Sequence, residues 1–163
     1  MPVYPTPAFE RKVCSQDALA ARIGALARPL VFTNGCFDIL HRGHVTYLAQ
    51  ARALGASLIV GVNSDVSVRR LGKGDDRPVN AEADRMAVLA ALEVVSLVTL
   101  FDEDTPLRLI LAIHPEIVVK GGDWPVEAIV GSREVLSWGG QVHSIPFLHL
   151  HSTTATLAKI RSL

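Results

Sequence analysis

Two histidines, His41 and His44, carry the most distinctive chemistry in this sequence. They are separated by Arg42 and Gly43, follow an apolar run at residues 30–32, and lead into a helix-forming stretch. A helix N-terminus carries partial positive charge and free N–H groups, so it binds anions. Gly43 lacks a Cβ and lets a phosphate approach the backbone. Because imidazoles can donate hydrogen bonds to a phosphoryl group whose charge changes during reaction, the segment predicts a site for nucleotide phosphates.

Two lysines lie in glycine-containing stretches that could bring further positive charge to these phosphates. Lys73 is flanked by Gly72 and Gly74, which let the loop fold a cation over a polyphosphate. Lys120 ends an apolar run and precedes two glycines, so it would present a cation and bare backbone to a ligand. An ordinary turn is the alternative at both positions.

Arg85 and a Ser-Thr-Thr run at residues 152–154 extend the candidate anion-binding set. The guanidinium of Arg85 could clamp phosphate oxygens, or it could pair with a neighbouring carboxylate on the surface. The hydroxyls of residues 152–154 lie at the start of the last predicted helix, where they could bind an anion or cap the helix. Asp38 could orient a histidine or a loop, and Asp65 could cap a short helix.

Alternating strands and helices must position these residues. Apolar runs predict five strands, at residues 30–32, 57–62, 94–101, 117–119 and 141–145. Helical spacing predicts helices at residues 15–26, 43–53, 65–70, 81–92, 106–113, 126–138 and 153–162. This alternation predicts one α/β domain, a Rossmann-like parallel five-stranded sheet with helices on both faces. The proline-rich residues 1–14 are expected to form an arm, and residues 15–163 the domain.

The topology selects the ligand-binding edge of the domain. In open parallel sheets the ligand binds beyond the carboxyl ends of the strands. That rule selects the loops at residues 33–44, 63–65, 120–124 and 149–154, which are rich in polar and small residues. The chemically interesting histidines and Lys120 fall in these loops, so we expect them to face one pocket.

Composition excludes several classes of protein. Lys plus Arg and Asp plus Glu number 16 each, so the formal charge of zero argues against a general nucleic-acid binder. Cys14 and Cys36 form no CxxC pair, and no Cys/His spacing predicts a zinc site, so we expect reduced thiols and no metal held by side chains alone. The sequence starts without a secretory signal and contains no apolar run of the roughly 20 residues that a membrane span needs. We therefore expect a cytoplasmic protein.

Motifs narrow the class of enzyme. The sequence contains neither GxGxxG after its first predicted strand nor GxxxxGK[ST] nor GxSxG. Residues 34–44, Asn-Gly-Cys-Phe-Asp-Ile-Leu-His-Arg-Gly-His, instead resemble the signature of the HxGH nucleotidyltransferase superfamily. From about residue 29 onward the chain is similar to the branch of adenylyltransferases that form ADP-heptose, through ordered motifs at residues 63–65, 77–80, 85–86, 103–106, 119–123 and 152–154. The glycerol-phosphate cytidylyltransferases share this pattern less well.

The resemblance implies a reaction: D-glycero-D-manno-heptose 1-phosphate and ATP give ADP-heptose and pyrophosphate, for lipopolysaccharide inner-core synthesis. It implies Mg²⁺ on the polyphosphate, in-line attack at the α-phosphorus and a homodimer. In many bacteria a kinase domain precedes this unit; here we expect the free-standing form. Two alternatives stay open: transfer from CTP to a polyol or sugar phosphate, and a nucleotide-binding sensor without catalysis. The intact cations His41, His44, Lys73, Lys120 and Arg85 argue against the sensor.

The resemblance also assigns roles to residues. His41, His44, Lys73 and Lys120 would be catalytic, and Arg85 would orient the nucleotide. The expected nucleotide contacts are Phe32, Thr33, Cys36, Phe37, Asn63, Asp65, Gly121, Gly122, Asp123, Ser152, Thr153 and Thr154. The expected supporting residues are Asn34, Gly35, Asp38 and Gly43. His149 and His151 stand where the family more often has an acidic or glycine-containing run.

Overall fold

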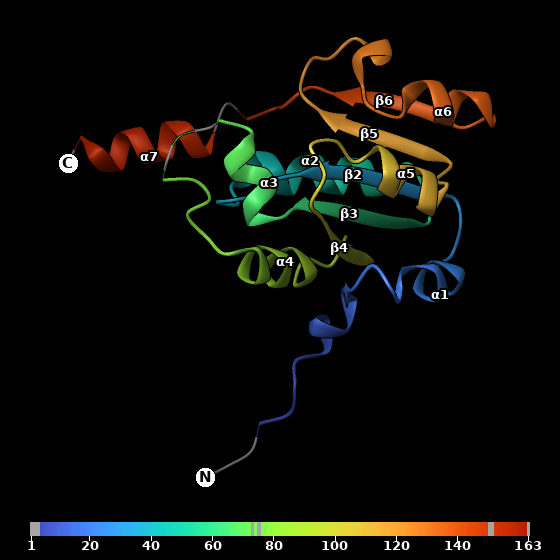
Figure 1. The fold of residues 1–163 in the computed structure, drawn as a ribbon, viewed down its shortest axis with the longest axis horizontal. Helices are drawn as coiled ribbons and strands as arrows, with labels where there is room; N and C mark the ends of the chain where they lie inside the picture. Colours follow the sequence, from blue (N-terminus) through green and yellow to red (C-terminus); the bar gives the residue numbers. More distant parts are fainter. Residues whose placement is uncertain (1–3, 73, 75, 150–151, 163) are drawn as a thin grey trace.

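Six parallel strands form the centre of the part of the chain that this computed structural model describes, residues 4–72, 74, 76–149 and 152–162 (Figure 1). Their spatial order is β1-β4-β3-β2-β5-β6. The strands are β1 (Val13–Cys14), β2 (Leu30–Gly35), β3 (Ser57–Asn63), β4 (Leu97–Phe101), β5 (Ile117–Gly121) and β6 (Gln141–Ile145). The α-helices are α1 (Leu19–Gly24), α2 (Arg42–Arg52), α3 (Asp65–Arg70), α4 (Glu82–Ala90), α5 (Leu107–Ile113), α6 (Ser132–Ser137) and α7 (Thr153–Arg161).

The sheet has one strand more than the five predicted from the sequence. The additional strand, β1, pairs in parallel with β4 through Val13 and Cys14. It lies within the segment expected to form an arm, directly after a 3-10 helix, η1 (Ala8–Lys12). Two residues are too few to show a strand period, so the apolar pattern could not reveal β1.

The sheet is covered on both faces, as predicted. Along β2, Leu30 and Phe32 belong to one apolar cluster, whereas Val31 belongs to the other. Side chains of a strand point alternately to opposite faces, so both faces of β2 are buried. Helices α2 and α4 cover the face of Val31, and α1, α5 and α6 cover the face of Leu30. This double burial explains why the central strands are apolar throughout.

The predicted helix at residues 126–138 is interrupted. The chain forms a short 3-10 helix, η2 (Val126–Ala128), and then α6. Between them Gly131 adopts a left-handed conformation with φ 83°, and a Cβ there would lie 2.7 Å from the Ile110 side chain. Glycine is suited to this turn because it has no Cβ.

The sheet reverses its winding between β2 and β5. The helix that follows β2, α2, packs on the face of Val31, whereas Ile129 and Val135, which follow β5, pack on the opposite face. Strands β2 and β5 are direct neighbours. Loops that leave adjacent strands toward opposite faces open a crevice at their carboxyl ends, where ligands bind in such folds. Among the described residues, no helix is long and apolar enough to cross a membrane.

Candidate active site

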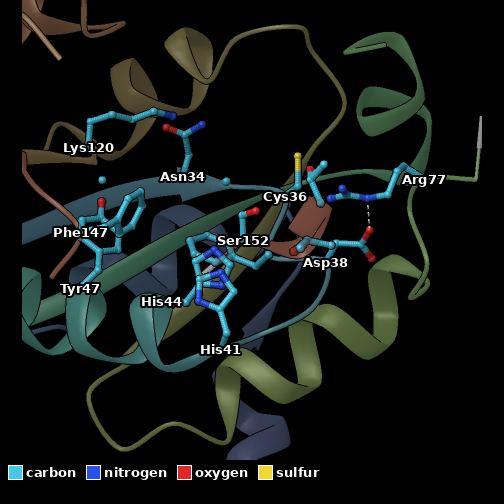
Figure 2. Close-up of a pocket in the computed structure, with 15 residues that line it drawn as sticks. Asn34, Cys36, Asp38, His41, His44, Tyr47, Arg77, Lys120, Phe147 and Ser152 are labelled. Carbon is cyan, nitrogen blue, oxygen red and sulfur yellow. Dashed lines mark hydrogen bonds and ion pairs between the residues drawn. The ribbon is translucent and has the colours of Figure 1, made fainter. Parts of the chain in front are cut away.

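A cavity of about 430 Å³ opens at this crevice (Figure 2). It is bordered by the loop between β2 and α2, the end of β5, and the start of α7. Its lining residues are Asn34, Gly35, Cys36, Phe37, Asp38, His41, His44, Tyr47, Arg77, Lys120, Gly121, Phe147, Ser152, Thr153 and Thr154. The structure thus brings together most of the residues that the sequence analysis predicted for the site, from segments far apart in the chain.

The two histidines form a stacked pair in this cavity. His41 is the N-cap residue of α2, and His44 lies in the first turn of that helix. Their ring centroids are 3.9 Å apart with an interplanar angle of 22°. The ring of Phe37 meets His44 edge-on, with centroids 5.3 Å apart. The pair is therefore held as one unit at a helix N-terminus, where an anion is favoured.

His44 is neutral at physiological pH. Burial and, to a smaller extent, the neighbouring His41 lower the pKa of His44 to about 4, although a hydrogen bond to the Ile39 backbone acts in the opposite direction. A buried Nδ1 of His44 finds no hydrogen-bond partner among the described residues. A neutral imidazole has a single N–H, so this ring can donate to a phosphate oxygen without carrying charge when that N–H is not donated to the Ile39 carbonyl.

Gly43 allows the histidine pair to pack against the helix. A Cβ at Gly43 would lie 3.1 Å from the carbonyl oxygen of His149 and 3.1 Å from the ring of His41. Both distances are shorter than ordinary van der Waals contacts, so a larger residue would displace the ring or the loop at residue 149. The close packing at Gly43 therefore leaves no room for a side chain between the histidine pair and the loop at residue 149.

The N-terminus of α7 borders the same cavity. Ser152 caps this helix, because its hydroxyl accepts a hydrogen bond from the Ala155 amide at 3.0 Å. Thr153 is buried, and its hydroxyl donates to the Ile39 carbonyl at 3.4 Å. Two helix N-termini, of α2 and α7, therefore converge on one cavity, and both favour negative charge there.

Asp38 holds the loop at residues 77–80 in place at the opposite rim of the cavity. Its carboxylate accepts hydrogen bonds from the amides of Val79 and Asn80, each at 2.9 Å, and from Arg77 Nε at 2.5 Å. Burial raises the pKa of Asp38, but these hydrogen bonds and the charge of Arg77 outweigh it and lower the pKa below its ordinary value. Of the two roles considered for Asp38, the structure places it with the loop rather than with a histidine.

The seam between β2 and β5 is closed by Tyr47. Its hydroxyl is hydrogen-bonded to Thr33 Oγ1 at 2.5 Å and donates to the Val119 carbonyl at 3.1 Å. Burial raises the pKa of Tyr47, so its phenol stays protonated. Tyr47 therefore joins β2 to β5 next to Lys120, near the end of β5.

Arg85 lies beneath the site. It is only 2% exposed, and its guanidinium donates to the carbonyls of Asn80, Cys36 and Asn63 at 3.0, 2.5 and 2.8 Å. It also pairs with Asp65 at 2.9 Å. Arg85 therefore joins the loop after β2, the end of β3 and the segment before α4, and it is not among the residues that line the cavity. Ser64, not Asp65, caps α3.

Several other predicted nucleotide contacts lie outside the cavity lining. Phe32 and Thr33 are buried within the sheet, and Asn63 donates to Ser67 Oγ at 3.0 Å. Gly122 and Asp123 follow the lining residue Gly121 but do not line the cavity themselves. Lys73 is outside the described residues.

Three lining residues were missed by the sequence analysis as site residues: Arg77, Tyr47 and Phe147. Arg77 begins the motif at residues 77–80, close to Lys73 in the sequence, so this position was an available signal. The other two are aromatic residues that the sequence offers no reason to separate from core residues.

The described residues contain no group of three or more His, Cys, Asp or Glu side chains that could hold a metal ion. Mg²⁺ commonly binds through substrate phosphates and one or two carboxylates rather than through a full set of protein ligands. Asp38, the carboxylate in the cavity lining, is already engaged by Arg77 and two amides. The described residues would therefore leave a Mg²⁺ ion to be held mainly by the phosphates of a bound polyphosphate.

The parallel sheet, the crevice at its switch point and the histidine pair are those of a nucleotide-binding α/β fold. The chain belongs to the cytidylyltransferase-like family, whose model matches residues 32–155. It is 57% identical over 155 residues to the D-beta-D-heptose 1-phosphate adenylyltransferase of Bordetella bronchiseptica, covering 94% of this chain and 96% of the relative. It is 52% identical over 159 residues to the bifunctional protein HldE of Geotalea uraniireducens, covering 96% of this chain but 32% of that protein.

Solved structures give the same fold. The lipopolysaccharide core biosynthesis protein of Thermoplasma volcanium matches with a TM-score of 0.60 and 28% identity, over 75% of this chain and 98% of that one. The pantoate-beta-alanine ligase of Francisella tularensis matches with a TM-score of 0.61 over 93% of this chain and 78% of that one. At 12% identity, this second likeness shows the fold alone.

Proposed function

We propose that this protein transfers the adenylyl group of ATP to D-glycero-D-manno-heptose 1-phosphate, forming ADP-heptose and pyrophosphate for lipopolysaccharide inner-core synthesis. The observation that carries the transfer chemistry is the stacked His41–His44 pair at the N-terminus of α2, in a cavity that α7 also borders. The choice of sugar is supported by the name of the Bordetella relative, which also specifies the β form of the heptose phosphate.

The proposed reaction is a single displacement at the α-phosphorus of ATP. An oxygen of the sugar phosphate attacks the α-phosphorus of ATP, and the bond from that phosphorus to the bridging oxygen breaks, leaving its electron pair on pyrophosphate. The protein forms no covalent bond. Phosphoryl-type transfer asks mainly for positioning and for stabilisation of charge, which the histidine pair and the two helix N-termini would supply. Lys120 and Arg77, on opposite sides of the pair, would hold the other phosphates.

Mg²⁺ would neutralise charge on the polyphosphate and would enter with ATP. We also propose a cytoplasmic homodimer, as the family resemblance implies. Light scattering of the purified protein during gel filtration measures the mass directly. A mass of one chain at working concentration would contradict the dimer.

The function is tested by measuring pyrophosphate release with Mg²⁺, the β form of heptose 1-phosphate, and ATP, CTP, GTP or UTP in turn. Release with ATP, together with ADP-heptose identified by mass spectrometry, is the expected result. Release with CTP instead would assign the protein to cytidylyl transfer. Binding of ATP without release, on this sugar phosphate and on a panel of other sugar and polyol phosphates, would indicate a sensor and overturn the proposal.

A further inference from the structure

One end of the cavity carries two aromatic rings and a lysine, and the other carries an ion pair. Phe147, Tyr47 and Lys120 lie at one end, Asp38 and Arg77 at the other, and the histidine pair lies between them (Figure 2). Phe147 follows the end of β6 and remains 40% exposed, unlike the buried phenylalanines of the sheet. An exposed ring that borders an otherwise polar cavity is available to a ligand.

The ring of Phe147 is held in place by its neighbours. A Cβ at Gly121 would lie 2.7 Å from Cζ and 2.9 Å from Cε1 of Phe147, so the ring lies directly on the bare backbone at the end of β5. Tyr47 meets the ring edge-on, with centroids 5.8 Å apart and an interplanar angle of 70°. Tyr47 is itself fixed by Thr33 and the Val119 carbonyl. The ring is therefore supported from two sides before any ligand binds.

The middle of the cavity favours phosphates, because two helix N-termini and the histidine pair meet there. Lys120 lies on one side of this middle, near Phe147, and the Asp38–Arg77 ion pair lies on the other. The base, which is flat and carries no charge, matches the exposed ring of Phe147 better than it matches the ion pair. Aromatic side chains stack on bases of every kind because each base has a π-face.

We propose that Phe147 is a base-binding residue, on whose ring the base of the nucleotide stacks. This inference rests on the proposed function only in requiring that a nucleotide binds in the cavity. Stacking alone does not distinguish one base from another, so Phe147 sets affinity for nucleotides as a class. The choice of ATP over CTP must come from other contacts.

The test compares a ligand that has a base with one that has none. Binding of a non-hydrolysable ATP analogue and of inorganic tripolyphosphate is measured by calorimetry, without sugar phosphate, for wild type, Phe147→Ala, Phe147→Leu and Phe147→Tyr. Phe147→Ala and Phe147→Leu should lower the affinity for the ATP analogue about 10- to 100-fold. The affinity of these two variants for tripolyphosphate should change less than about twofold. Phe147→Tyr should bind both ligands as tightly as wild type does. Leu148→Ala, at the neighbouring residue with 66% exposure and outside the cavity lining, is the matched control.

Two outcomes would overturn the inference. In the first, Phe147→Ala and Phe147→Leu bind the ATP analogue as tightly as wild type does. In the second, their affinities for the ATP analogue and for tripolyphosphate fall by the same factor, which would mean that the ring shapes the phosphate site. Circular dichroism verifies that the variants are folded, and Phe147→Tyr keeps the test valid if the smaller residues disturb the loop. Since no turnover is measured, a wrong sugar substrate would leave this result unaffected.

Discussion

Asp38 and Arg77 form a buried ion pair at the rim of the cavity, with Arg77 Nε 2.5 Å from Asp38 Oδ2. The side chains are 0% and 6% exposed, respectively. The same carboxylate accepts the amides of Val79 and Asn80, so one charge holds both a cation of the cavity lining and the loop that carries it. The position of Arg77 therefore depends on Asp38.

Replacing one partner of this pair should be costly. Asp38→Asn would leave the Arg77 charge buried without its counter-charge, and we expect a loss of about 3–5 kcal/mol in the free energy of unfolding, measured in urea. The double variant Asp38→Asn with Arg77→Met should lose less free energy of unfolding than the sum of the losses in the two single variants, because the two residues interact directly. Additive losses would show that the ion pair is not the source of the effect.

His44 should make the fold less stable in mild acid. In the unfolded chain the ring takes a proton near pH 6.5, whereas in the folded protein it does so only near pH 4. Between these values the unfolded state binds more protons, so stability falls as pH falls, by at most about 1.4 kcal/mol per pH unit. Burial raises the pKa of Glu116, but its hydrogen bonds from the Leu30 amide and Arg28 lower it below the ordinary 4.5, as the partners of Asp38 lower that pKa below 3.8. The stability that these two carboxylates contribute is lost mainly in stronger acid, as the pH falls below these ordinary values.

Thermal melting between about pH 5 and pH 6.5 isolates this effect of His44. The melting temperature of wild type should fall across this range, and that of His44→Gln should fall less. His143→Gln, on β6 and outside the cavity lining, should retain the slope of wild type. An equal slope in wild type and His44→Gln would contradict the assignment.

His44→Ala should lower turnover by more than tenfold, on the order of 100-fold, because it removes a hydrogen-bond donor aimed at charge that develops in the transition state. The melting temperature at neutral pH should show that the variant is folded. Val45→Ala, at an exposed position next in the same helix, should keep turnover close to wild type. Near-normal turnover of His44→Ala under saturating substrates would exclude the proposed role.

Arg85 should matter for stability more than for nucleotide affinity. Arg85→Met removes four hydrogen-bonded or ionic contacts and leaves the carbonyls of Cys36 and Asn63 without this donor. We expect a loss of about 3–5 kcal/mol in urea unfolding. The KM for ATP in the fraction that stays folded should change far less than the unfolding free energy does. A large rise in KM without loss of stability would restore the predicted contact between Arg85 and the nucleotide.

Much of this fold was visible in the sequence because its signals are local. The apolar run and the histidine-containing loop predicted β2 and the start of α2, and helical spacing predicted α3 and α5 within a residue. The sequence did not predict β1, because two residues are too few to show the strand period. It predicted α6 as too long, because Gly131 adopts a left-handed conformation next to Ile110 and interrupts the helix.

The roles of Arg85, Arg77 and Phe147 depend on contacts across the chain. Arg85 is bound by carbonyls 22 and 49 residues away, so its burial follows from tertiary packing and not from its own helix. Arg77 is 39 residues from Asp38. Phe147 reaches the cavity only because β6 pairs with β5 beside Gly121. A residue's own surroundings in the sequence carry no signal for such contacts.

In the proposed reaction, an oxygen of the sugar phosphate attacks the α-phosphorus of ATP in this cavity. The decisive experiment supplies heptose 1-phosphate whose phosphate carries heavy oxygen, together with unlabelled ATP and Mg²⁺, and analyses the products by mass spectrometry. We expect ADP-heptose that retains all of the label on its sugar-side phosphate, with unlabelled pyrophosphate. Labelled pyrophosphate or labelled inorganic phosphate, or no ADP-heptose from folded protein that binds both substrates, would rule out this reaction.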